Sequence, residues 1–367
     1  MLIKEIKIGK IDMPLKKIYK VSNREITFSE EVVIKVIADN GKVGYGSAAP
    51  APTVTGETEN SIISSIRYIE KHIKGMDVYA LDRIMSVMDK CIKGNSSAKA
   101  AVDMALYDLL AKQYGVPLYK FLGGYHNSIL TDVTIQDDVV ENMVKNSLEA
   151  MLSGYKDLKI KLGLEVFNED LEKIKSIRKA VRKSVNLRVD GNGAWTAKEA
   201  IQIIRKLEEA GLDIDFVEQP VKPWDMEGLK LVKNSVETMI LADESVFGYS
   251  TSEAFRVIEN RSCDYINLKL MKSGGIHNAA KIHSMAEAMG IKCMMGCMIE
   301  SKIGITAAAS LAVAKENMIT ADLDTMLSFE EDPIIGGAIF EKNKITLPEE
   351  PGLGIKELLN WKEIKEY

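Results

Sequence analysis

Charged side chains recur at nearly equal intervals through the middle of the chain. Each lies at or near the end of a short apolar run, and successive members are 25 to 29 residues apart: Lys161, Asp190, Glu218, Asp243 and Lys269. About 30 residues is the length of one strand–helix unit. Side chains at the carboxyl ends of successive strands of a barrel face the same mouth. We therefore expect these five residues to converge on one site.

Three of these residues are carboxylates on consecutive predicted strands: Asp190, Glu218 and Asp243. A single carboxylate there could simply begin a solvated loop. Three turned inward would repel one another unless a cation joins them. Hard oxygen ligands with positions left for water or substrate suit Mg²⁺, with Mn²⁺ as the alternative. No His or Cys lies at these three strand ends, which disfavours zinc.

Two lysines share one face of the predicted strand at 157–163. Side chains alternate along a strand, so Lys159 and Lys161 point one way while Ile160 and Leu162 point the other. An ordinary lysine is protonated at neutral pH. A nearby positive charge, from a second ammonium or a metal, disfavours the charged form. The pair therefore predicts an amine that can act as a base.

The chain changes its pattern at about Tyr125. Before it, a hairpin at 30–48 with an Asn40-Gly41 turn and several helical patterns indicate an α+β unit. After it, eight short apolar segments alternate with mostly helical ones: 130–135, 157–163, 186–192, 215–220, 239–245, 264–272, 292–300 and 319–324. This alternation favours a β/α barrel in the α/β class. A doubly wound open sheet would normally show a glycine-rich phosphate-binding turn after its first strand, and none is present.

Composition limits the kind of protein. The 367 residues are 46% hydrophobic and 28% charged, as in an ordinary globular protein. A net charge of −5 gives no general basic surface for nucleic acid. The start of the chain lacks the apolar stretch of a signal peptide, no run is long enough for a membrane span, and the four cysteines are scattered. We expect a cytoplasmic protein with a small-molecule substrate, assembled as a homo-oligomer.

Six stretches together carry a family resemblance. They are the Lys-x-Lys of 159–161, VDGNGAW (189–195), VEQP (217–220), ADES (242–245), NLKLMKSGG (267–275) and AVDMALYDLLAKQYGVPLYKFLGG (101–124). In these stretches the chain resembles the enolase superfamily, its muconate-lactonizing subgroup and, within that, the dipeptide epimerases. The resemblance implies a capping domain (1–125), a (β/α)7β TIM-type barrel (126–325) and a C-terminal segment (326–367) that returns to the cap.

The resemblance also implies a reaction and its catalysts. A metal-dependent isomerase of this kind removes the proton α to a carboxylate and returns it on the other face. Lys161 would serve the (R) centre and Lys269 the (S) centre, while Lys159 would donate to the developing enolate. Asp190, Glu218 and Asp243 would hold Mg²⁺. The branch that uses a His on strand seven is disfavoured, because 292–300 has none.

The expected substrate is a dipeptide, L-Ala-L-Glu converted to L-Ala-D-Glu. By resemblance Asp322 and Asp324 bind the ammonium group from one face of the last strand, and Arg24 in the cap binds the acidic side chain. Thr134 and the backbone around Cys297 and Ile299 complete the pocket. Ser47 stands where relatives commonly have Glu, which leaves the side-chain preference open.

Three alternatives remain open from the sequence. An epimerase could act on apolar or cationic dipeptides instead of acidic ones. A muconate-type cycloisomerase would act on a carboxylate without an ammonium group, and the Asp322/Asp324 pair argues against it. A non-catalytic metal-binding barrel would have no use for both Lys161 and Lys269.

Overall fold

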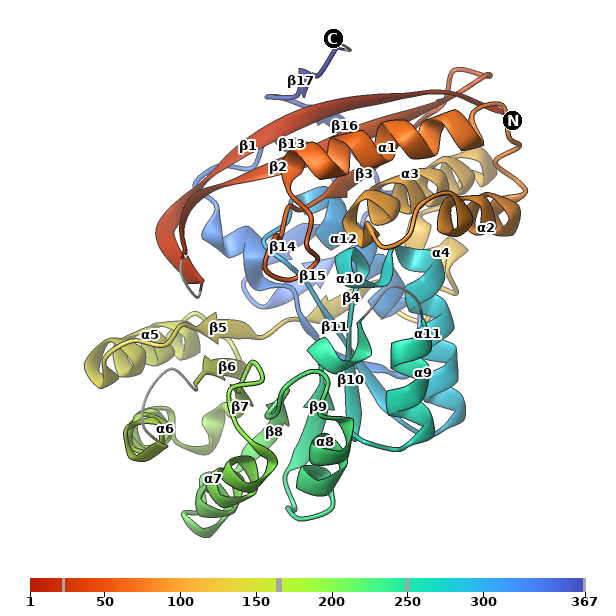
Figure 1. Ribbon diagram of the computed structural model, residues 1–367. Helices are drawn as coiled ribbons and strands as arrows, with labels where there is room; N and C mark the ends of the chain where they lie inside the picture. The colour runs from red at the N-terminus through yellow and green to blue at the C-terminus, as the bar shows by residue number, and fades with distance from the viewer. Residues whose placement is uncertain (22–23, 163–166, 248–250, 366–367) are drawn as a thin grey trace.

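The computed structural model describes residues 1–21, 24–162, 167–247 and 251–365, with the side chains of 17–27 and 167–168 left out of the description. An N-terminal part with a long antiparallel hairpin lies against one end of a β/α barrel (Figure 1). The barrel with its separate N-terminal capping domain confirms the fold expected from the sequence.

The capping domain is an antiparallel sheet covered by helices. Its elements are β1 (Ile3–Val21), β2 (Arg24–Ala38), β3 (Val43–Ala48), α1 (Glu59–Ile73), α2 (Leu81–Cys91), α3 (Ser96–Tyr114) and α4 (Leu118–Phe121). The strand order is β1-β2-β3, and the β2–β3 connection contains Gly41 at φ +82°. The inner face of α1 is fully buried through Ile62, Ile66 and Ile69. Burial of this apolar stripe ties the helix to the sheet.

Eight parallel strands form the barrel. They are β5 (Val133–Ile135), β6 (Asp157–Lys161), β7 (Asn186–Asp190), β8 (Ile214–Glu218), β9 (Met239–Ala242), β10 (Tyr265–Lys269), β11 (Lys292–Gly296) and β12 (Met318–Asp322). Each pairs with the next, and a parallel bridge between Thr131 and Ala321 joins the two ends of the sheet. Strands β6 and β10 are four positions apart in this order, so they stand on opposite sides of the barrel.

Helices alternate with these strands around the outside. They are α5 (Val140–Leu152), α6 (Phe167–Val181), α7 (Ala197–Glu209), α8 (Met226–Lys233), α9 (Ser252–Glu259), α10 (Leu270–Ser273), α11 (Ile276–Ala288) and α12 (Lys302–Val313). Short 3-10 turns occur at η1 (Arg182–Ser184), η2 (Glu244–Val246) and η3 (Asp324–Ser328). No helix in the described ranges is both long and apolar enough to cross a bilayer.

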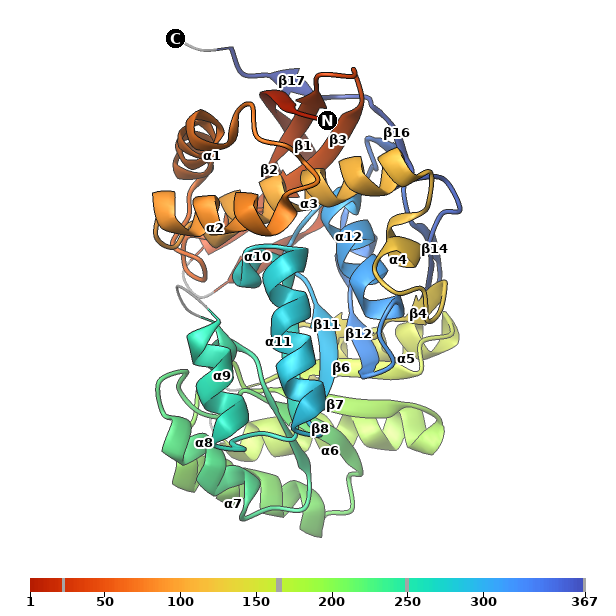
Figure 2. The same cartoon turned by 90° about the vertical axis from the view of Figure 1, so that its right-hand side faces the viewer.

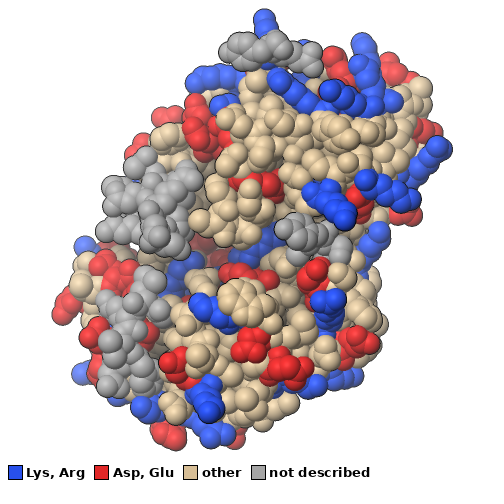
Figure 3. All heavy atoms as spheres, in the orientation of Figure 1, with Lys and Arg blue, Asp and Glu red and all other residues tan. Residues whose placement is uncertain are grey.

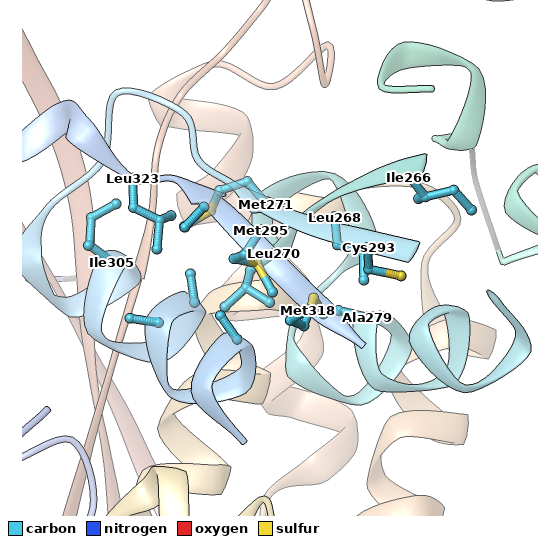
Figure 4. Packing of buried hydrophobic residues seen from close by; sticks show 14 of the residues in the cluster. Ile266, Leu268, Leu270, Met271, Ala279, Cys293, Met295, Ile305, Met318 and Leu323 are labelled. Atoms are coloured by element: carbon cyan, nitrogen blue, oxygen red, sulfur yellow. The ribbon is translucent and has the colours of Figure 1, made fainter. Parts of the chain in front are cut away.

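The alternation of each strand decides which side chains reach the barrel interior. On β10, Ile266 and Leu268 join the apolar layer that packs against the surrounding helices (Figure 4). Their neighbours Asn267 and Lys269 therefore point inward. Phe216, Leu241 and Met294 form a small separate apolar cluster. One strand thus supplies both the outer core and a functional side chain.

Helix α3 connects the capping domain to the rest of the chain. Its buried Asp108 accepts hydrogen bonds from the N–H groups of Tyr45 (2.8 Å) and Leu353 (2.7 Å). Its buried Asp103 accepts from Ile276 (2.6 Å) and His277 (3.1 Å) at the start of α11. The 101–124 stretch therefore joins the cap to α11, the second helix after Lys269.

The last residues return toward the cap. The remaining strands are β4 (Ser128–Leu130), β13 (Ile334–Gly336), β14 (Ile339–Glu341), β15 (Lys344–Thr346), β16 (Ile355–Leu358) and β17 (Lys362–Glu363). β15 pairs with β4 and with β14, and β13 pairs with β16. β17 pairs with β1 of the cap, as the turned view also shows (Figure 2).

Candidate active site

Lys159 lies at the centre of a cluster of three carboxylates from three strands, β7, β8 and β12. Its Nζ is 3.1 Å from Asp190 Oδ2, 2.8 Å from Glu218 Oε2 and 2.8 Å from Asp322 Oδ2. The side chain is only 4% exposed. Burial alone would lower the pKa of Lys159, but the three carboxylates outweigh it and hold the pKa well above its ordinary value. Lys159 is therefore a cation here, suited to donate a hydrogen bond to developing negative charge.

A second cluster surrounds Asp243, which follows β9. Lys269 Nζ lies 3.0 Å from Asp243 Oδ2, and Lys272 Nζ lies 3.1 Å and 3.0 Å from the two carboxylate oxygens. Despite burial, the two ammonium groups lower the pKa of Asp243. Burial disfavours the charged form of Lys269, but Asp243 raises its pKa above the ordinary value. While this ion pair persists, Lys269 keeps its proton.

Lys161 has a more open setting. It ends β6 on the same face as Lys159, is half-buried, and its Nζ lies 3.4 Å from Asn192 Oδ1. Ile160 and Leu162 on the other face are buried. Lys161 and Lys269 therefore end opposite strands of one barrel, on either side of the carboxylates.

The donor set fits a divalent cation. Asp190, Glu218 and Asp243 end or follow three neighbouring strands, and Asp190 pairs in register with Glu218. Glu218 Oε2 is buried and, apart from its ion-pair distance to Lys159, has no hydrogen-bond partner within the described part of the chain. In the described part of the chain no three Asp, Glu, His or Cys side chains converge into a ready metal cluster. Instead, these carboxylates pair with the ammonium groups of Lys159 and Lys269. Carboxylate oxygens, with the remaining octahedral positions left to water or substrate, suit Mg²⁺.

The two aspartates predicted to bind an ammonium group occupy different elements. Asp322 is the last residue of β12, whereas Asp324 begins the turn η3 rather than continuing the strand. Asp324 Oδ2 accepts the Thr134 N–H at 2.7 Å. Burial and the charge of Asp322 raise the pKa of Asp324 to about 6. Among the described residues Asp324 has no ion pair, so a cation at this position would be stabilised.

The predicted substrate contacts from strand seven lie in the turn after β11. Cys297 and Ile299 are half-buried, and the Ile299 carbonyl accepts a hydrogen bond from Ser29 of the cap at 3.4 Å. Burial and neighbouring acids raise the pKa of the Cys297 thiol, so it stays neutral. Arg24 begins β2 and its backbone pairs with Val21, but its side chain lies outside the described residues.

Several residues that hold the site were missed by the sequence reasoning. Asn267 Nδ2 donates to Glu218 Oε1 at 2.8 Å. The Gln219 Oε1 atom accepts the N–H groups of Asp243 (3.0 Å) and Ser245 (3.1 Å), which fixes the β9 turn. Lys272 forms the Asp243 contact described above. Asn267 and Lys272 lie within the quoted NLKLMKSGG motif, and Gln219 lies within VEQP, so the motifs contained this signal.

Acidic and basic atoms are visible in a recess between the capping domain and the barrel (Figure 3). A parallel barrel whose strands end in lysines and carboxylates under an α+β cap is the architecture of the enolase superfamily. The chain belongs to this superfamily. Residues 142–357 match the enolase C-terminal domain-like family, and residues 5–123 match the mandelate racemase/muconate lactonizing enzyme N-terminal domain.

Within the superfamily the chain is similar to dipeptide epimerases. It is 48% identical to an L-Ala-D/L-Glu epimerase of Clostridium acetobutylicum over 98% of this chain and 100% of the relative. A substrate-liganded L-Ala-D/L-Glu epimerase of Bacillus subtilis superposes with a TM-score of 0.94 at 43% identity, covering 97% and 99% of the two chains. A dipeptide epimerase of Enterococcus faecalis with Mg and L-Leu-L-Tyr superposes with a TM-score of 0.93 at 39% identity, covering 97% and 100%.

Proposed function

We propose that the chain is a Mg²⁺-dependent dipeptide epimerase, an isomerase that inverts the α-carbon of the C-terminal residue. The observation that carries the proposal is the placement of Lys161 and Lys269 at the ends of opposite strands, β6 and β10, with the carboxylates between them. Two amines facing one α-carbon from opposite sides allow one to remove a proton and the other to return one. The names of the similar proteins support this reaction class.

Asp190, Glu218 and Asp243 would hold the metal. When bound, Mg²⁺ would supply positive charge next to the substrate carboxylate and would take up the Asp243 charge that keeps Lys269 protonated. Lys159, buried and paired with Asp322, which is not a proposed metal ligand, would donate a hydrogen bond to the same developing charge. Lys161 handles the proton at the (R) centre and Lys269 the proton at the (S) centre.

The preferred substrate is L-Ala-L-Glu and its D-Glu epimer. The α-ammonium group would lie against Asp322 and Asp324, since Asp324 is half-buried and has no ion pair among the described residues. Thr134 and the backbone around Cys297 and Ile299 would line the pocket. Arg24 would meet the acidic side chain, as in a charge-assisted, bidentate Arg–carboxylate contact.

The test includes a second possible substrate preference. One similar structure is an epimerase with L-Leu-L-Tyr bound, so a preference for apolar dipeptides is the alternative. The purified enzyme with Mg²⁺ is incubated in deuterated water with L-Ala-L-Glu, L-Leu-L-Tyr and L-Ala-L-Lys, and α-deuterium incorporation and optical inversion are followed. Fastest inversion of L-Ala-L-Glu supports the proposal. Exchange with none of the panel contradicts dipeptide epimerisation, and faster L-Leu-L-Tyr inversion overturns only the acidic preference.

A further inference from the structure

One strand of the capping domain contacts the turn at 297–301. Ser29 and Glu31 are two residues apart on β2 and so point to the same face. Ser29 Oγ donates to the Ile299 carbonyl at 3.4 Å, and the Ser301 N–H donates to Glu31 Oε2. Across the sheet, Ser47 Oγ lies 3.4 Å from Ser301 Oγ. Side chains on two cap strands, β2 and β3, therefore contact the same five-residue turn of the barrel, 297–301.

Glu31 is an unusual residue to find in this contact. Its side chain is fully buried, and its second oxygen, Oε1, has no hydrogen-bond partner among the described residues. A buried carboxylate with an unpaired oxygen costs free energy, so its presence needs a compensating role. Ser301, immediately before α12, makes no side-chain cap of its own. Glu31 supplies an acceptor from another domain, at the end of α12 where negative charge is stabilised.

The same turn is also ordered from within. The Met298 N–H donates to Glu300 Oε1 at 2.9 Å, and Glu300 is buried. Cys297 and Ile299 alternate with these residues along the turn and are half-buried. Fixing Ser301 and Ile299 from the cap therefore fixes the backbone that the proposed substrate would meet.

Ser47 on the next strand lies beside Glu31. It pairs with Val33, so on the pleated sheet it is a diagonal neighbour of Glu31 on the same face. Its hydroxyl lowers the pKa of the Glu31 carboxyl, against the larger effect of burial. Glu31 on β2 and Ser47 on β3 thus approach the same turn from neighbouring strands.

We propose that Glu31 is a positioning residue of the active site, which holds the 297–301 turn against the capping domain and so sets the backbone that binds the dipeptide. This inference rests on the proposed function, because it assigns Glu31 to dipeptide binding. Contacts made equally in the substrate complex and the transition state change KM and leave kcat nearly unchanged.

The test compares four variants with L-Ala-L-Glu as substrate: Glu31→Ala, Glu31→Gln, the exchange Glu31→Ser with Ser47→Glu, and Ser29→Ala as a matched control. Gln keeps the acceptor for the Ser301 N–H and is expected to stay close to the native KM. Glu31→Ala is expected to raise KM on the order of tenfold with kcat within about twofold, the effect of losing one charged hydrogen bond. The double variant Glu31→Ser/Ser47→Glu is expected to bring KM most of the way back to the native value. Ser29→Ala, which removes a long neutral hydrogen bond, is expected to change KM less than Glu31→Ala does.

Hydrogen exchange by mass spectrometry gives a readout independent of catalysis. Amides of 297–305 are expected to exchange faster in Glu31→Ala than in the native chain. In Glu31→Gln and in the double variant Glu31→Ser/Ser47→Glu they are expected to exchange at the native rate. Unchanged KM and unchanged exchange in folded Glu31→Ala would overturn the proposal, as would a fall in kcat alone. If Glu31→Ala does not fold, the double variant Glu31→Ser/Ser47→Glu decides. Faster amide exchange at 297–305 in that variant than in the native chain would count against the proposal. If the native enzyme epimerises no dipeptide, the proposed function fails, while the exchange data still report whether Glu31 holds the turn.

Discussion

The charge state of each lysine is set by the carboxylates that it contacts. Lys159 contacts three of them and has a pKa far above the working range of a base. Lys269 contacts one, Asp243, which Lys272 also contacts. A cation at Asp243 would therefore favour the neutral form of Lys269, whereas Lys159 would still pair with Asp322. Residues of one type in one site thus acquire different roles from their partners.

The two-base assignment predicts a distinctive phenotype for Lys269→Ala. Epimerisation should fall by roughly a hundred- to ten-thousandfold, because general acid–base groups contribute roughly 10²–10⁴-fold. Exchange of the α-proton should persist with the one stereoisomer whose proton faces Lys161. Proton NMR in deuterated water separates the two processes. Near-native epimerisation by the variant would require a one-base mechanism instead.

Glu31 predicts a particular pH dependence of stability. Burial raises its pKa from 4.5 to about 7, so its contribution to folding is complete below pH 4.5 and is lost as the pH rises through about 7. Gln at this position does not titrate. The stability of Glu31→Gln relative to the native chain should therefore rise between pH 4.5 and 8, by on the order of 3 kcal/mol. Urea unfolding at several pH values measures this.

Glu341→Gln, a change at an exposed carboxylate, measured over the same pH values provides the control. If the stability difference between Glu31→Gln and the native chain did not vary with pH, the predicted pKa of Glu31 in the folded chain would be wrong.

At the scale of elements, the period of the sequence was sufficient to place charged residues at strand ends. The 25-to-29-residue spacing predicted Lys161, Asp190, Glu218 and Lys269 at the strand ends where they occur, because the alternation of strands and helices follows from local pattern. Asp324 shows where this reasoning ends. The pattern alone extended the strand through it, yet β12 ends at Asp322 because the chain turns there into η3.

The contacts that the sequence could not give are those between distant segments. The Asn267–Glu218 bond and the hold of Gln219 on the β9 turn depend on which strands become neighbours. Glu31 is separated from Ser301 by 270 residues. Such pairings follow from the closed barrel and the docked cap, and neither the residue types nor their spacing specify them.

Gly296 links the geometry of β11 to the Lys269 side chain. A Cβ at this position would lie 2.8 Å from Lys269 Cε and would also collide with the Asn267 carboxamide. Gly296→Ala should therefore displace Lys269 and lower kcat by roughly tenfold or more, since small misplacement of a catalytic group is costly. Steady-state kinetics with circular dichroism to verify folding would measure this.

Gly41→Ala is the contrasting variant. Gly41 has φ +82° and open space around its Cβ position, so the substitution should cost about 1 kcal/mol of stability and leave kcat unchanged. If Gly296→Ala were as active as Gly41→Ala, the close approach at Lys269 would not be needed for catalysis.

In the whole molecule, the cap and the barrel both contribute to the mouth. The β1–β2 hairpin contacts the segment that follows β12, where Leu15 pairs with Phe329 and Lys16 Nζ donates to the Leu327 carbonyl at 3.0 Å. Leu327 lies within η3, which begins with Asp324, and Phe329 follows η3 directly. The cap hairpin, in which β2 begins with Arg24, thus contacts the turn η3 that begins at the proposed ammonium site. A substrate with charges at both ends would need both segments close to it.

This arrangement predicts that two substitutions separate the two ends of the substrate. Losing one charged hydrogen bond costs about 1.5–3 kcal/mol, or roughly ten- to over a hundredfold in kcat/KM. Arg24→Ala should impose that loss on L-Ala-L-Glu and far less on L-Ala-L-Leu, because only the first has a side-chain carboxylate. Asp324→Asn should weaken both dipeptides, because both carry the ammonium group. Kinetics of the two variants on both dipeptides give the comparison, and equal losses on both from Arg24→Ala would remove Arg24 from side-chain recognition while leaving the epimerase assignment to Lys161 and Lys269.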